Sequence, residues 1–469
     1  MATELWSWQN GTSSADMFDA ATMGLDGSVV LAGYTGGDWA SPNAGGNDFA
    51  AVKLDADGML LWQWQGGTTG DDKVNAAAMA EDGSVLMAGW TSGTWGEAEA
   101  GFYDFVAVKL DAAGKLLWNW QGGSQVNDVW WAVDMADDGS ALFAGTTFGD
   151  WVQVSVGSWD FAAMKMDVDG NVLWTWQDGT RWSDTFWAGV MDKDGSVVLA
   201  GGTEGDFALG SKGQRDFVVV KLDAEGKELW RWQDGTSGMD EITCAAVGDD
   251  GSIVVAGNTD DGLYDHPLAP SHQDFTATKL DADGNMLWQW KGGASFGSYV
   301  EGVAVLDDGS ILLSGFTADS FAGKNIGSYD VAAIKLDANG NEIWRYQDGT
   351  ANFDRIDAAA TGFNGRMIMA GHTTGDWEGI NHGKEGFLAL MLDIDRPSPS
   401  PVFRAPGMDP TIPSPTATPT VTPPRVGMSS PTAVPTATVV PQASVPQLVT
   451  FSPMSAISAR TNNPIKKTP

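Results

Sequence analysis

The stretch that decides the fold covers residues 104–123 and reads DFVAVKLDAAGKLLWNWQGG. Its first seven residues are apolar at nearly every position, which is typical of a strand buried on both faces. A turn at Ala113-Gly114 follows, and the next residues, Leu-Leu-Trp-Asn-Trp-Gln, form a second strand rich in large apolar side chains. The stretch therefore predicts a β-hairpin that packs between two other sheets.

The same pattern recurs along the chain in two independent registers. The Asp-Phe pair begins at Asp48, Asp104, Asp160, Asp216 and Asp274, and it persists in weaker form at Asp330-Val331 and Gly386-Phe387, in steps of 56, 56, 56, 58, 56 and 56 residues. The paired aromatic residues lie at Trp6/Trp8, Trp62/Trp64, Trp118/Trp120, Trp174/Trp176, Trp230/Trp232, Trp288/Trp290 and Trp344/Tyr346. Seven copies of a repeat of about 56 residues indicate a repeat architecture.

Each repeat predicts four strands in two hairpins. An Asp-Gly or Asn-Gly turn joins the first two strands, and we expect a type I′ turn because these pairs tolerate the required positive φ angles. Four-stranded units that cannot bury their faces alone must stack, and seven of them arranged radially make a β-propeller. Residues 5–9 read as a lone fourth strand and residues 387–392 as a lone third strand. Pairing these two segments would close the ring and remove two exposed sheet edges.

The repeated motif Asp-Phe-x-Ala-x-Lys-Leu-Asp-Ala-x-Gly-x-x-Leu-Trp-x-Trp-Gln-Gly-Gly, with Asp-Gly-Ser-x-x-x-Ala-Gly-x-Thr, resembles the SBBP-type β-propeller repeat over residues 4–393. Part of it is also similar, more weakly, to the tryptophan-bearing repeat of PQQ-type quinoprotein propellers and to NHL repeats. The resemblance to NHL propellers implies that the small-residue strand is innermost and the Trp-x-Trp strand outermost. The resemblance to WD-repeat rings implies closure by the N-terminal strand.

Composition bounds the domains and their partners. We expect the propeller to cover residues 1–395 and a disordered Pro/Ser/Thr-rich tail to cover 396–469, because such a composition supplies too little apolar surface for a core. The tail holds six basic residues and one acid, so the propeller carries a net charge of −40. This charge opposes phosphate contacts and excludes nucleic acid as an expected partner. We expect a monomer without a membrane-inserted segment. No signal peptide is visible, whereas the tail composition favours a cell-surface or extracellular location.

A ring of carboxylates is the candidate metal site. One Asp opens the predicted inner strand of six repeats, at Asp16, Asp72, Asp128, Asp184, Asp240 and Asp354, with Ser298 as the exception. Carboxylates around one end of the axis would suit Ca²⁺, which prefers oxygen ligands. The competing interpretation is that each side chain caps the turn before it within its own blade. Repetition favours capping, and we expect no cofactor.

The candidate ligand site lies at positions that differ between repeats. Three residues after the inner Asp stand Asp19, Asn75, Trp131, Trp187, Thr243, Glu301 and Asp357, while their neighbours stay small. With Trp130 and Trp182, the two Trp residues of this set predict four indoles around one end of the axis, a surface suited to a sugar or a cationic ligand. The competing interpretation is that these aromatic residues fill space between small neighbours.

The sequence is compatible with three functions. The one favoured here is a non-enzymatic binding or interaction scaffold for a protein or glycan ligand, since no Ser/His/Asp triad, phosphate loop or His-x-x-x-His pair occurs. The second is a glycan-binding, lectin-like propeller, which rests on the loop aromatic residues that include Trp39, Trp95 and Trp151. The third is a quinoprotein-type oxidoreductase, for which only the adjacent pair Trp130-Trp131 offers a surface that would stack on a planar cofactor.

Overall fold

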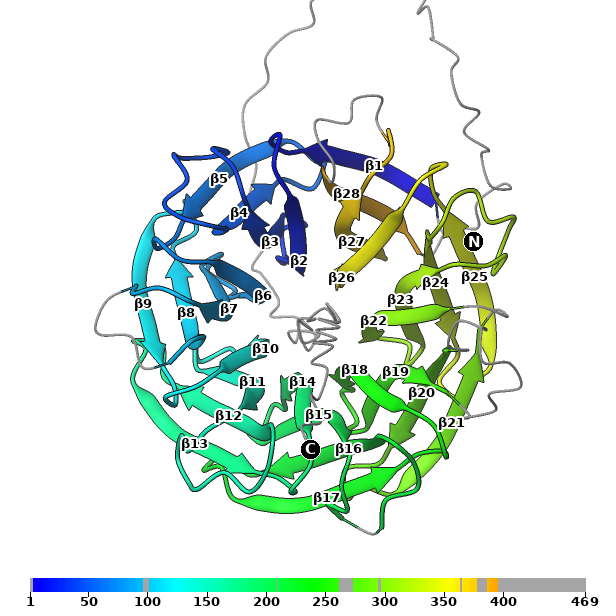
Figure 1. Ribbon diagram of the computed structural model, residues 1–469. Coiled ribbons are helices and arrows are strands. Elements are labelled where there is room, and N and C mark those ends of the chain that lie inside the picture. The colour runs from blue at the N-terminus through cyan, green and yellow to red at the C-terminus, as the bar shows by residue number, and fades with distance from the viewer. Residues whose placement is uncertain are drawn as a thin grey trace, which may run out of the picture.

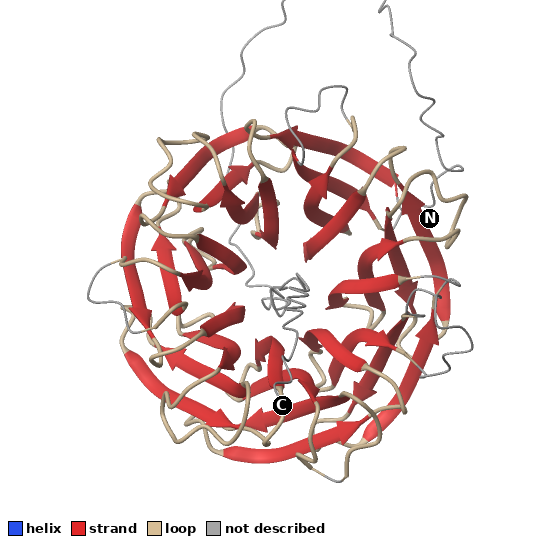
Figure 2. Ribbon diagram, in the orientation of Figure 1, coloured by secondary structure: helices blue, strands red, loops and turns tan. Residues whose placement is uncertain are grey.

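The computed structural model is a ring of seven blades, each a four-stranded antiparallel sheet (Figure 1). It describes residues 3–95, 101–208, 210–260, 273–293, 297–362, 365–377 and 386–394. The predicted tail at 396–469 lies outside these residues. All regular structure in the described part is strand (Figure 2), and no helix there is long and apolar enough to cross a membrane. The predicted seven-bladed β-propeller is therefore confirmed.

Every strand has the place in its blade that the repeat predicts. The innermost strands of blades 1 to 7 are β2 (Asp16–Met23), β6 (Asp72–Met79), β10 (Asp128–Met135), β14 (Asp184–Met191), β18 (Asp240–Val247), β22 (Ser298–Val305) and β26 (Asp354–Gly362). The second strands are β3 (Val29–Thr35), β7 (Val85–Thr91), β11 (Ala141–Thr147), β15 (Val197–Thr203), β19 (Ile253–Thr259), β23 (Ile311–Thr317) and β27 (Arg366–Thr373). The third strands are β4 (Asp48–Leu54), β8 (Asp104–Leu110), β12 (Asp160–Met166), β16 (Asp216–Leu222), β20 (Asp274–Leu280), β24 (Asp330–Leu336) and β28 (Gly386–Asp393). The outermost strands are β5 (Leu60–Gly66), β9 (Leu116–Gly122), β13 (Val172–Asp178), β17 (Glu228–Asp234), β21 (Met286–Gly292), β25 (Glu342–Asp348) and β1 (Thr3–Asn10).

The N-terminal strand closes the ring. β1 pairs antiparallel with β28 from Thr3 opposite Asp393 to Asn10 opposite Phe387, so blade 7 is assembled from both ends of the described chain (Figure 1). The Trp6 indole then donates a hydrogen bond to the Ala56 carbonyl of blade 1 at 3.2 Å. The pairing removes two free sheet edges and joins the last blade to the first.

The core lies between the blades. The third strand of blade 2 is buried at all seven positions, which explains why it does not alternate between polar and apolar residues. On the loop face, an aromatic side chain that follows the second strand packs into six of the seams, as where Trp95 packs on Phe49 of the preceding blade at a centroid distance of 5.0 Å, and the corresponding loop of blade 5 lies outside the described residues. These aromatic residues are therefore interblade packing rather than a free platform for sugars.

The hairpin turns differ in detail from the expected type I′ turn. In blade 1 the Gly27 amide donates to the Gly24 carbonyl and the Gly24 amide to the Ser28 carbonyl, so the loop has three residues instead of two. Gly27 takes a φ of 78°, and Asp26 accepts a hydrogen bond from the Ser28 amide at 2.9 Å. The Asp-Gly pair is thus explained by a capping Asp followed by a left-handed Gly.

Candidate functional site

A β-bulge occurs at the same place in every innermost strand. The pairing with the second strand skips one residue after the third position, as between Phe18 and Ala20 in β2. The seven skipped residues, which we call the bulge residues, are Asp19, Asn75, Trp131, Trp187, Thr243, Glu301 and Asp357. These are the blade-variable positions that the sequence singles out. A bulge re-aims a side chain at the inner edge of a blade, so a uniform frame carries five kinds of side chain at this position.

A glycine in the second strand makes room for each bulge. A Cβ on Gly145 would lie 2.1 Å from the Val129 carbonyl oxygen, and the equivalent clash recurs at all seven copies. The glycines are Gly33, Gly89, Gly145, Gly201, Gly257, Gly315 and Gly371. The repeated Ala-Gly or Ser-Gly of the second strand was therefore the sequence signal for the bulge, and it is more informative than the turn glycines because it points to the residues that vary.

The carboxylates of the candidate metal ring act within their own blades. Asp128 accepts hydrogen bonds from the Ser124 amide and the Thr147 hydroxyl, each at 2.5 Å. Asp16, Asp72, Asp184, Asp240 and Asp354 make the same pair of contacts with their own blades' residues, and Ser298 bonds to the Thr317 hydroxyl instead. Burial raises the pKa of Asp128 and that of Asp184 to about 6. Within the described residues, no three His, Cys, Asp or Glu side chains come together as a metal site requires.

The four predicted indoles do not form one surface. Trp130 is fully buried in the seam between blades 2 and 3, where its ring stacks on Phe105 at 3.7 Å. Strand alternation causes this, because Trp130 precedes the bulge and occupies the slot that Phe18 fills in blade 1. Trp182 is 51% exposed on the connection between blades 3 and 4, beside the Arg181 guanidinium. Only Trp131 and Trp187 meet, at a centroid distance of 4.6 Å.

Around this pair lies an apolar group that we call the aromatic sector, formed by Trp90, Val129, Trp131 and Trp187 of blades 2, 3 and 4. The Trp187 indole donates to the Glu241 carboxylate of blade 5 at 2.6 Å. Glu241 lies 3.3 Å from the Arg215 guanidinium, and burial raises its pKa although Arg215 opposes the shift. The buried Trp131 indole N–H finds no hydrogen-bond partner among the described residues. This N–H is a donor that a ligand atom would satisfy.

Across the ring axis lies the charged sector, which we define as Asp19, Glu301, Arg355, Asp357 and His372 of blades 1, 6 and 7. Arg355 pairs with Asp357 at 2.5 Å and with Glu301 at 3.5 Å, and His372 Nδ1 lies 2.9 Å from Asp357. Burial alone would raise the pKa of Asp357, but the charges of Arg355 and His372 hold it below its usual value. Burial and the charge of Asp357 raise the pKa of Asp19 to about 7.

The two remaining bulge residues link neighbouring blades. Asn75 donates to the Trp130 carbonyl at 2.8 Å, and Thr243 donates to the Val300 carbonyl at 2.6 Å. Both acceptors lie on the inner strand of the next blade, one residue before its bulge. These two side chains are therefore structural, and the variable set divides into an aromatic sector, a charged sector and two polar links.

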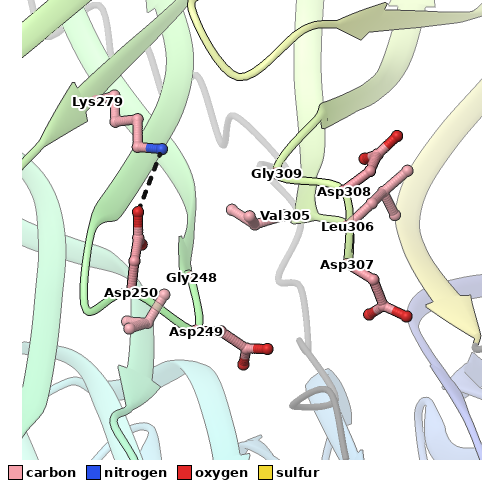
Figure 3. A pocket seen from close by; sticks show the side chains of 10 residues that line it. Gly248, Asp249, Asp250, Lys279, Val305, Leu306, Asp307, Asp308 and Gly309 are labelled. Atoms are coloured by element: carbon pink, nitrogen blue, oxygen red, sulfur yellow. Dashed lines mark ion pairs between the residues drawn. The ribbon is translucent and has the colours of Figure 1, made fainter. Parts of the chain in front are cut away.

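A separate cavity lies on the opposite face of the ring, at the hairpin turns of blades 5 and 6 (Figure 3). Its volume is about 250 Å³, and its walls include Asp250, Leu306 and Asp308, with Lys279 3.9 Å from Asp250. The Asp-Gly turns that line it recur in six of the seven repeats, with Asn364-Gly365 in the seventh, and the lysine also recurs in six. The blade-variable residues, by contrast, gather at the bulges, so we place the candidate site there.

Comparisons with known proteins support the fold more than a function. No family model matches the chain. It is 29% identical to the regulatory protein FlaEY of Caulobacter vibrioides over 341 residues, which is 65% of this chain but only 33% of that protein. Hydrazine synthase of Kuenenia stuttgartiensis matches at a TM-score of 0.50 and 12% identity, over 77% of this chain and 94% of that one. The Pan2 WD40 domain of Neurospora crassa matches at a TM-score of 0.47 and 11% identity, over 84% and 96%.

Proposed function

We propose that this protein is a non-enzymatic binding propeller that takes its ligand across the bulge residues, with the aromatic sector as the main contact. The carrying observation is the contrast between a uniform frame and variable bulges: the bulge and its glycine recur in all seven blades, while the side chain at the bulge changes. Packing requirements repeat with the frame, whereas recognition of an asymmetric ligand needs different groups in different blades. Concave features with a few convergent polar groups are the usual place for such recognition.

The ligand that these surroundings fit best is a protein segment. The loops above blades 2 and 3 expose Phe102 at 77% and Val154 at 75%, together with Phe148, Val152 and Val156. Apolar side chains gathered on a loop are typical of protein interaction sites, and the three valines that share the loop of blade 3 offer no stacking face to a sugar ring. Protein interfaces commonly have large aromatic residues in a desolvated centre, and the aromatic sector with the exposed loop residues around it has this arrangement. A protein partner therefore accounts for both the exposed loop residues and the aromatic sector.

Two observations weigh against the oxidoreductase alternative. Trp130 and Trp131 lie on different sides of the inner strand, one in the seam and one in the aromatic sector, so they form no joint platform for a planar cofactor. The sequence has a single cysteine, Cys244, which is buried, so it lacks the adjacent cysteine pair that many quinoproteins carry. The description of the Caulobacter relative as a regulatory protein is in keeping with a binding role.

A displayed library of random 12-residue peptides tests this proposal. Peptides selected on the intact protein should bind Trp131→Ala and Trp187→Ala at least about tenfold more weakly, because truncating a central aromatic anchor costs about 2 kcal/mol or more and about 1.4 kcal/mol is tenfold. Trp62→Ala is the matched control: it removes an indole from the outer strand β5, where the indole bonds to the Ala112 carbonyl, and should leave affinity unchanged. Equal binding by all three variants, or selective binding of a glycan panel in place of peptides, would overturn the proposal.

A further inference from the structure

Among the three bulge carboxylates, Asp19 is the one without an ion pair to a described residue, whereas Glu301 and Asp357 each have one. The Asp19 side chain is 4% exposed, and no hydrogen bond or ion pair from a described residue reaches it. Glu301 and Asp357 both lie against the Arg355 guanidinium, and Asp357 also has His372. A buried carboxylate without a partner is costly unless it is protonated or receives a cation. The charged sector therefore has three acids around a single guanidinium, with one acid left over.

The groups that face Asp19 come from the neighbouring blades on both sides. Asp357 and Arg355 stand on β26, His372 on β27 and Lys73 on β6, and all four act on the charge of Asp19. Arg355 and His372 each contact Asp357. The Lys73 ammonium lies 4.3 Å from the centroid of the Tyr34 ring. Asp357 works against the ionisation of Asp19, whereas Lys73, His372 and Arg355 favour it without offsetting the effect of burial. A cation on a ligand would give Asp19 an ion-pair partner and would offset the repulsion between Asp19 and Asp357.

We infer that Asp19 forms a subsite for a basic side chain, a guanidinium or an ammonium group, of a protein ligand. This inference deepens the proposed function and rests on it for the identity of the ligand as a protein segment. The propeller's net charge of −40 adds long-range attraction for a basic segment. Such a segment would place an apolar residue on the aromatic sector and a basic residue on Asp19.

Binding at this subsite must release a proton near neutral pH. The pKa of Asp19 is about 7, raised first by burial and then by Asp357, so part of the protein carries a neutral Asp19 at pH 7. A cation favours the ionised carboxylate and displaces that proton. The affinity for a cation should therefore rise between pH 6 and pH 8 and should level off above that range.

The test uses N-acetyl-argininamide as the probe in isothermal titration calorimetry on the full chain. We expect saturable binding at pH 8, at least tenfold weaker binding to Asp19→Asn, and proton uptake by the buffer at pH 7 when buffers of different ionisation enthalpy are compared. Asp134→Asn is the matched control, because it removes a second buried inner-strand carboxylate whose pKa is also about 7 but which lies on β10 and bonds to backbone amides. It should bind the probe as the intact protein does.

Three results would overturn the inference. They are the absence of saturable binding to the intact protein, equal binding of the uncharged analogue N-acetyl-citrullinamide, and equal affinity of Asp19→Asn and the intact protein. The proton release is measured on unaltered protein, so it does not depend on whether a variant folds. Failure here is distinguishable from failure of the proposed function, because the peptide experiment depends on Trp131 and Trp187 and the probe experiment on Asp19 alone.

Discussion

At the scale of the residue, the hydrogen-bond partners of a buried acid decide what it does. Asp19 and Asp134 are both acids of inner strands, and the pKa of each is raised to about 7, chiefly by burial. They differ in their partners: Asp134 accepts hydrogen bonds from the Met135 amide and, across the seam, from the Met191 amide of blade 4, each within 2.9 Å, whereas Asp19 has none in the described part of the chain. Asp134 therefore links two blades, whereas Asp19 is a buried acid without a hydrogen-bond partner among the described residues.

The pH dependence of stability should report the buried Asp134. Its pKa of about 7 in the fold exceeds the ordinary value of 3.8, so the fold favours the neutral acid. The stability that this preference contributes is fully present below pH 3.8 and is lost as the pH rises through 7. Between pH 4 and pH 8 the free energy of unfolding should therefore fall more steeply for the intact protein than for Asp134→Asn, by on the order of 2–4 kcal/mol.

Urea denaturation at several pH values measures this difference directly. The other buried acids are present in both proteins, so their contributions cancel in the comparison. Two curves of unfolding free energy against pH that run parallel from pH 4 to pH 8 would show that Asp134 is not perturbed by the fold.

At the scale of the element, the bulged inner strand combines one fixed and one free position. The glycine of the second strand must stay small, because a Cβ at Gly145 would lie 2.1 Å from the backbone oxygen of Val129. The bulge residue beside it is under no such constraint, and it ranges from Asp19 to Trp131 across the blades. The strand therefore separates what the fold requires from what recognition requires.

Replacing a bulge glycine should be far more damaging than replacing a loop glycine. We expect Gly145→Ala to lower the free energy of unfolding by roughly 3 kcal/mol or more, because the new Cβ must displace backbone of the neighbouring strand. Gly323→Ala is the control, since no atom lies within 4 Å of its Cβ position, and it should change stability by less than about 0.5 kcal/mol. Thermal and urea unfolding check both, and similar losses for the two variants would contradict the role of the bulge.

The predictability of these elements from the sequence follows the same division. The third strand, the Trp-x-Trp strand and the closing strand repeat as patterns, and periodicity was enough to place all of them. The bulge residues also stood out, because they vary within a constant frame. The direction of a side chain was not predictable: Trp130 and Trp131 are adjacent in sequence, yet one enters a seam and the other meets Trp187. That outcome follows from strand alternation at the bulge, and residue propensity does not say which face of the strand lies in the seam.

The charged sector was even less predictable from the sequence pattern. Arg355 and His372 are essential to it, but they stand outside the bulge positions and were not singled out. Their role arises because the inner strands of blades 7 and 1 meet side by side only when the ring closes (Figure 1). Residues more than 330 positions apart, Asp19 and Asp357, become neighbours in this way. Long-range pairing of this kind needs the closed fold and not the repeat alone.

At the scale of the whole molecule, stability depends on closure, since each blade buries its faces only against two neighbours. The seam between blades 7 and 1 is held by Phe18 stacked on Phe387 at 3.9 Å and by Trp6 bonded to the Ala56 carbonyl. Blade 7 obtains its outer strand from residues that precede blade 1 in the chain. Removing that strand would leave β28 as a free edge with a buried apolar composition, which favours pairing with another chain.

Deleting residues 1–9 should therefore destabilise the entire ring and not blade 7 alone. The deletion removes the β1–β28 pairing and the Trp6 and Trp8 contacts with blade 1, so the seam between the first and last blades opens and their facing apolar side chains become wet. We expect a melting temperature lower by more than 10 °C. The deletion should cost several kcal/mol of stability, and each kcal/mol lowers the melting temperature of a large domain by about 2–4 °C. Differential scanning calorimetry measures the change, and size-exclusion chromatography at increasing concentration detects association through the free edge.

As a control, Leu61→Ser on the outer strand β5 changes one exposed side chain and leaves all pairings intact, and it should melt as the intact protein does. A shortened protein that melts within a degree or two of the intact one, and stays monomeric, would show that seven blades hold together as an open stack.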